Sequence, residues 1–200
     1  MIRGEGFTID EKKFDFFFGR VTSNPKNTSR SLGIAMKINT INQSEFHLID
    51  PSRKVIIHDN PQKFALLDLG EPWGCYGINW RSDVIEPVIQ PSTDKLTLWI
   101  GIDQRLAAMD LQHGNICISM PLMMPLFDIA IADNFTAILT EMEVFLFTPN
   151  RTLACFQVLP DLTSSISVSG ANFAIEMFDG SSYILTRSGL LKETSKVALS

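Results

Sequence analysis

The stretch Leu96–Ser119, LTLWIGIDQRLAAMDLQHGNICIS, predicts three short strands that fold back on one another. Its first part, LTLWIGI, alternates along the chain with aromatic and β-branched residues, and a period of two of this kind is typical of a strand. The polar breaks at 103–104 and 112–115 suit hairpin turns. The stretch therefore indicates a small antiparallel sheet.

The middle of this stretch also permits a second interpretation. Residues 105–111 are rich in Ala, Leu and Met, which favour helices. A short apolar run cannot be assigned to a strand or a helix by periodicity alone. One amphipathic helix over 105–111 is therefore the alternative to the second strand.

Similar segments recur along the chain and favour the strand. A forward shift of 38 places Leu96–Ser119 on Asn134–Gln157, so that LAAM at 106–109 falls on VFLF at 144–147. Val and Phe side chains are typical of strands. The same shift places Cys117 on Cys155.

Two more copies extend the pattern. A further shift of 38 reaches Phe173–Leu185, where Asp179-Gly180 is a strong hairpin signal. A backward shift of 42 reaches Gln62–Leu69, with Val55–Ile57 as the strand before it. A period near 40 residues is the signature of propeller blades or of a solenoid.

These patterns predict an all-β repeat protein of small antiparallel sheets. The expected architecture is a compact β-propeller of about four to five blades, or an open propeller-like array. The chain is predicted to form a single domain over 1–200, since this length suits one core. Within it, 1–45 is expected to be an N-terminal cap or closing blade, and 46–200 to hold four repeats. Residues 45–50 are expected to form a short strand.

One repeat resembles the blade of the β-propellers named after pyrroloquinoline-quinone enzymes. The matching residues are Leu98–Gly101, then Ala108–Asp110 and Gly114. The blade of that family ends Ala-x-Asp-x-x-Thr-Gly-x-x-x-Trp, whereas here His113 stands at the Thr and Ile118 at the Trp. The resemblance implies blade topology and neither quinone binding nor dehydrogenase chemistry.

Composition favours a reducing compartment and argues against nucleic acid as a partner. The net charge is -5, and the chain holds no run of Lys and Arg that would form a phosphate-binding face. Its cysteines, Cys75, Cys117 and Cys155, lie 42 and 38 residues apart, as the repeats do, so we expect equivalent, buried, reduced core positions. A charged N-terminus and a run broken by prolines at 116–132 predict neither a signal peptide nor a membrane span. We expect a cytoplasmic location.

The sequence shows no set of residues arranged for catalysis. His47, His58 and His113 have no metal-ligand spacing, and the last two flank predicted turns. Aspartates such as Asp103 and Asp179 also fall at turns, where an Asp side chain accepts hydrogen bonds from its own backbone. We therefore expect no catalytic residue, no metal and no cofactor.

The candidate binding residues are Trp73, Tyr76, Trp80 and Arg81. They lie in a segment that departs from the repeat and is rich in Gly and Pro. Trp, Tyr and Arg carry much of the binding energy in protein interfaces. The alternative is that the rings fill the space between blades, where large side chains are needed.

The leading functional hypothesis is a non-enzymatic protein-protein interaction module on a small propeller-like scaffold. Fold alone supports only this analogy. One alternative is a small propeller enzyme, a lyase or hydrolase, with its site at the central opening. Another is a structural subunit of a homo-oligomer that completes its sheets with a second copy.

Overall fold

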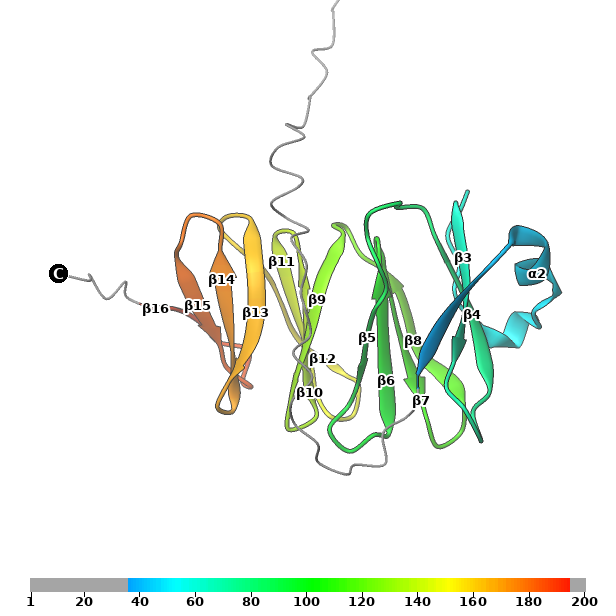
Figure 1. The fold of residues 1–200 in the computed structure, drawn as a ribbon. Helices are drawn as coiled ribbons and strands as arrows, with labels where there is room; N and C mark the ends of the chain where they lie inside the picture. Colours follow the sequence, from blue (N-terminus) through cyan, green and yellow to red (C-terminus); the bar gives the residue numbers. More distant parts are fainter. Residues whose placement is uncertain (1–35, 195–200) are drawn as a thin grey trace, which may run out of the picture. The chain divides into compact units, whose positions relative to one another are not determined.

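The computed structural model describes residues 36–194, which form four sheets of four strands each (Figure 1). The helices in this part are α2 (Gln43–Leu48) and a 3-10 turn, η1 (Pro51–Arg53). The predicted all-β fold of small sheets is confirmed. The first 35 residues of the expected cap or closing blade lie outside the described residues.

Each sheet is built from neighbouring segments of the chain. The first sheet contains β1 (Lys37–Ile41), β2 (Lys54–Ile56), β3 (Lys63–Asp68) and β4 (Cys75–Trp80). The second contains β5 (Val88–Pro91), β6 (Thr97–Ile102), β7 (Arg105–Asp110) and β8 (Asn115–Pro121). The third contains β9 (Leu126–Ala132), β10 (Phe135–Thr140), β11 (Glu143–Phe147) and β12 (Leu153–Val158). The fourth contains β13 (Thr163–Ser169), β14 (Asn172–Met177), β15 (Ser182–Leu185) and β16 (Leu191–Thr194).

The second, third and fourth sheets are antiparallel meanders, in which each strand pairs with the next one in the chain. This is the blade topology that the resemblance of Leu96–Ser119 implied. The predicted strands of that stretch are β6, β7 and the first part of β8. The helix alternative for 105–111 is wrong, because β7 pairs with β6 on one side and β8 on the other.

The first sheet departs from the meander. Its order is β1-β3-β4-β2, and β2 pairs parallel with β4 instead of antiparallel with β3. The short strand expected at 45–50 is also wrong, since α2 occupies most of that segment. Asn42 caps this helix: its side chain accepts a hydrogen bond from the Glu45 N–H (2.9 Å), and the Glu45 carboxylate accepts one from the Asn42 N–H (2.8 Å). This reciprocal capping box stabilises the first helical turn.

Hydrophobic clusters lie between consecutive sheets, so neighbouring sheets share their cores. Residues of the first and second sheets form one cluster, among them Leu67, Ile78, Ile100 and Met109. Residues of the second and third sheets form the next, among them Trp99, Leu106, Ile138 and Phe145. Residues of the third and fourth sheets form another, among them Leu139, Leu146, Phe173 and Ile175.

Strand β6 shows how one sheet serves two clusters. All six of its residues are buried. Ile100 packs toward the first sheet, whereas Trp99 packs toward the third, since successive side chains in a strand point to opposite faces. Gly101 lies on the same face as Trp99, and a Cβ added there would overlap with the side chain of Leu126 in β9. The glycine therefore permits the close approach of the second and third sheets.

The outer faces of the first and fourth sheets are covered or polar. On the first sheet, Phe46 of α2 is 3% exposed and packs on Phe64 with ring centroids 5.4 Å apart. A Cβ on Gly77 would lie 3.0 Å from the Phe46 ring, so the helix rests directly on the strand. On the fourth sheet, the face opposite Ile175 carries polar residues such as Ser167 and Glu176.

The predicted burial of the cysteines is wrong. Cys75 and Cys117 are exposed, and Cys155 is half-buried. Cys117 and Cys155 lie in β8 and β12, which are edge strands and have no strand beyond them in their sheets. Their predicted equivalence fails by one residue, because the chain between equivalent paired residues is one residue shorter in the third sheet: Met109 pairs with Ile116, whereas Phe147 pairs with Leu153.

The contact at Gly101 gives a prediction about stability. Gly101→Ala should destabilise the protein by roughly 1–3 kcal/mol, because the added methyl group overpacks the boundary between the second and third sheets. In a Leu126→Ala background the same change should cost little, because the smaller side chain leaves room for it. Urea unfolding of the four proteins of this double-mutant cycle measures the coupling. If Gly101→Ala lowers the free energy of unfolding equally in both backgrounds, position 101 and Leu126 do not contact each other.

The thiols should differ in their rates of reaction. Partial loss of contact with water raises the pKa of all three thiols, so labelling should be slow at neutral pH and faster as the pH rises toward 9. Cys155 should react last, because its side chain packs against Gly189. The three labelling rates can be measured with a thiol reagent on native variants that each keep a single cysteine. Uniform rates equal to those of the unfolded chain would contradict this ranking.

Candidate functional site: a polar pocket between the first two sheets

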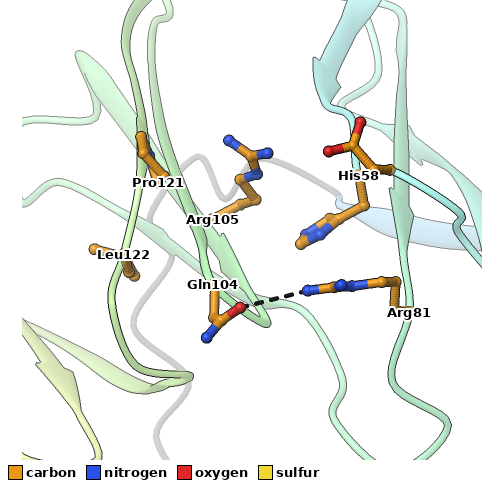
Figure 2. A pocket seen from close by; sticks show the side chains of 7 residues that line it. His58, Arg81, Gln104, Arg105, Pro121 and Leu122 are labelled. Atoms are coloured by element: carbon orange, nitrogen blue, oxygen red, sulfur yellow. Dashed lines mark hydrogen bonds between the residues drawn. The ribbon is translucent and has the colours of Figure 1, made fainter.

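A small pocket lies where turns of the first and second sheets meet. It encloses about 110 Å³ and is lined by His58, Asp59, Arg81, Gln104, Arg105, Pro121 and Leu122. His58 and Asp59 follow β2, and Arg81 follows β4. Gln104 belongs to the β6–β7 turn, and Arg105 begins β7. In Figure 2 the side chains of His58 and Arg81 face those of Gln104 and Arg105 across the opening.

Asp103 joins the two sheets at this pocket. Its carboxylate accepts hydrogen bonds from the backbone N–H groups of Arg81 (2.8 Å) and Ser82 (3.3 Å). It is buried, and its φ of 48° is in the left-handed region, which Asp adopts more readily than most residues. The sequence predicted that an Asp here would cap its own turn, but it binds the chain of the neighbouring sheet instead. These bonds fix the position of the Arg81 backbone directly after the end of β4.

Gln104 extends this link to the side chains. Its Oε1 accepts a hydrogen bond from Arg81 Nη2 at 3.4 Å, and its Nε2 donates to the carbonyl of Met123 at 3.0 Å. Its backbone carbonyl accepts from the N–H of Leu122 at 2.9 Å. A more open hollow of about 330 Å³ also includes Arg81 and Gln104, which thus lie between two depressions. Both side chains are positioned at the surface by a well-connected turn.

His58 is the buried group of the pocket. It is 5% exposed, and its backbone N–H donates to Asn79 Oδ1 at 2.6 Å. The pKa of His58 lies below its usual value, chiefly because burial disfavours the charged ring. Asp103 and a hydrogen bond with the Ile102 backbone oppose this decrease, whereas Arg105 and Arg81 add to it. Its Nε2 has no hydrogen-bond partner among the described residues.

The structure separates the four residues proposed as a binding loop. Trp73 and Tyr76 lie near the β7–β8 turn: Trp73 Nε1 donates to the Leu111 carbonyl at 2.5 Å, and the Tyr76 hydroxyl donates to the Gly114 carbonyl at 3.5 Å. Trp80 and Arg81 lie at the other end of β4, near the β6–β7 turn. Within this set, Arg81 is the residue that lines the pocket.

The burial of the rings fits the alternative interpretation, in which they fill space between blades. Tyr76 is 2% exposed and Trp80 is 3% exposed, and both belong to the cluster between the first and second sheets. Trp73 is half-buried and packs against the same cluster. Tyr76 and Trp80 lie in strand β4, whereas Gly70, Pro72 and Gly74 lie in the turn that precedes it.

Sequence reasoning missed His58, Gln104 and Arg105 as members of one site. His58 lies more than forty residues before Gln104 and Arg105 in the chain. Each flanks a predicted turn, and this was the available signal. Turns of different repeats meet only once the sheets pack, so their shared pocket was not visible in the sequence.

Among residues 36–194, no group of three or more His, Cys, Asp or Glu residues is placed to hold a metal ion. No helix there is both long enough and apolar enough to cross a membrane.

Comparisons with known proteins found similar structures but no similar sequence. No protein-family model and no curated protein matches the chain. One similar solved structure is described as dihydro-heme d1 dehydrogenase NirN in complex with DHE: the identity is 13%, the TM-score is 0.48, and the match covers 72% of this chain and 35% of that one. Another is described as KlHsv2 with loop 6CD replaced by a Gly-Ser linker, with 11% identity, a TM-score of 0.37, and 56% and 39% coverage. The chain thus spans well under half the length of either structure.

Trp80 provides a direct test of the space-filling interpretation. Trp80→Ala should cost roughly 3–5 kcal/mol of stability, because it opens a cavity between the first two sheets. Trp80→Phe should cost only about 1 kcal/mol, because the Nε1 that it removes has no hydrogen-bond partner in the described part of the chain. Urea unfolding of both variants measures the two losses. An alanine variant as stable as the original protein would favour the exposed binding loop instead.

Proposed function

We propose that this chain is a non-enzymatic module that binds a protein partner at the turns between its first two sheets. The observation that carries this proposal is the placement of Arg81 and Gln104 between two hollows, on turns of two sheets that the Asp103 carboxylate ties together. Binding residues on loops are effective when a rigid scaffold positions them. Arginine is among the residues that contribute most at protein interfaces.

Apolar side chains near Arg81 and Arg105 support the same function. Met123 is 78% exposed, and its carbonyl accepts the hydrogen bond of Gln104. Pro121 and Pro125 line the two hollows. A flexible methionine can adapt to the shape of a partner, and rigid prolines lose little entropy on binding. The surface thus combines apolar contact area with guanidinium groups that give orientation.

The test is differential capture by the full chain from an extract of its native host. Original protein, Arg81→Glu and Lys192→Glu are immobilised separately, and retained proteins are quantified by mass spectrometry. Lys192 is an exposed residue of β16 and is the matched control, because its substitution changes the charge equally. A true partner should be depleted about tenfold or more by Arg81→Glu, since loss of a hot spot costs at least ~2 kcal/mol.

The Arg81 variant should remain folded, because the bond to Asp103 comes from its backbone N–H and the side chain is exposed. Circular dichroism checks this. If every retained protein survives Arg81→Glu as well as it survives Lys192→Glu, the proposed binding surface is wrong.

A further inference from the structure

His58 supplies the first step of an inference about what the pocket recognises. Its ring is buried and points into the opening (Figure 2). Its Nε2 has no hydrogen-bond partner among residues 36–194. Buried polar atoms in folded proteins nearly always have a hydrogen-bond partner. A buried, unpartnered nitrogen that lines a pocket therefore points to a ligand.

The charges around His58 decide what kind of ligand this is. The charged groups that face it are the guanidinium groups of Arg81 and Arg105 and the carboxylate of Asp103, and the Asp59 carboxylate also lines the pocket. The two positive and two negative groups balance when His58 is neutral, so these groups then carry no net charge. Protonation of His58 changes this sum to +1. The pocket becomes attractive to an anion when Nε2 takes up a proton.

The donors are also placed for an anion. The Asp103 carboxylate is already bound by two backbone N–H groups. The Arg105 guanidinium has no hydrogen bond or ion pair within the described chain, and that of Arg81 has one long bond to Gln104. Guanidinium groups bind carboxylate and phosphate oxygens with two parallel hydrogen bonds. A space of about 110 Å³ admits a single small group of this kind.

We propose that this pocket binds an oxyanion, the carboxylate of an acidic side chain on the partner, together with a proton that His58 takes up from solvent at Nε2. The inference rests on the proposed function, since it names the chemistry that the same surface recognises. Arg81 and Arg105 hold the oxygens, and protonated His58 is the third donor. An oxyanion beside the ring stabilises its charged form, which burial disfavours in the free protein.

The sign of the pH dependence follows from this linkage. The free protein has a lowered His58 pKa, and the bound anion raises it. Protons are therefore taken up on binding, and affinity increases as the pH falls from about 8 to about 5.5. Each pH unit by which the pKa rises corresponds to about tenfold in affinity. A glutamate side chain remains ionised at pH 5.5, since its usual pKa is about 4.3.

The experiment is an NMR titration of the full chain at pH 5.5 and pH 8 with three probes. These are a blocked Gly-Glu-Gly peptide, its Gly-Gln-Gly counterpart and inorganic phosphate. We expect the Glu peptide to bind at least about tenfold more tightly at pH 5.5, and the Gln peptide not to bind. The imidazole signals of His58 should show a higher pKa with the Glu peptide present. Arg105→Gln should weaken binding by about tenfold or more, whereas Lys192→Gln should leave it unchanged.

The outcomes separate the possible failures. Equal affinity at both pH values, equal binding of the Glu and Gln peptides, or an unaffected Arg105→Gln variant would each overturn the inference. Binding of phosphate without the Glu peptide would show a site for a free anion and would also overturn it. A partner that depends on Arg81 in the capture experiment, with no pH-dependent peptide binding, would leave the proposed function standing. If the Glu peptide binds as expected but no partner depends on Arg81, the inference about the pocket stands and the proposed function is wrong.

Discussion

The fold depends on hydrophobic cores that consecutive sheets share. A four-stranded sheet has two faces, and in this protein the inner strands bury side chains on both. In β6, Ile100 packs toward the first sheet and Trp99 toward the third, while Gly101 lets the second and third sheets approach closely. Because each core needs residues from two repeats, the stability of one sheet depends on its neighbours, as in other repeat proteins.

Shared cores explain why the outermost described faces differ from the rest. An apolar sheet face that no other element covers would be exposed to water. The first sheet places α2 on its outer face through Phe46, and the fourth carries serines and Glu176 on its own. The first sheet also replaces the meander with a parallel β2–β4 pair. The candidate pocket lies where this irregular sheet meets the first regular one.

Asp103 connects the architecture to the chemistry of that pocket. Its left-handed conformation turns the carboxylate onto the chain that follows β4, so that Arg81 is held beside Gln104. The same carboxylate contributes to the balance of charges around His58. In this balance a single proton changes the pocket from neutral to positive. The proposed recognition of an acidic group would therefore depend on a buried histidine as much as on the two arginines.

The sequence by itself determined the local structure. The alternation in Leu96–Ser119 and its copies, together with the turn residues between them, predicted the strands of the regular sheets, because side-chain period and turn chemistry are local properties. The signal for α2 was also present in the Asn42–Glu45 capping box, but the short strand expected there obscured it.

Only the tertiary structure decided the parallel β2–β4 pair, the exposure of Cys117 and the burial of Trp80. It also decided the pocket itself. Strand partners, edge positions and the meeting of distant turns depend on how sheets pack, and packing brings together residues far apart in the chain. The repeat pattern showed where each turn lies, and only the packed sheets placed His58 beside Arg105.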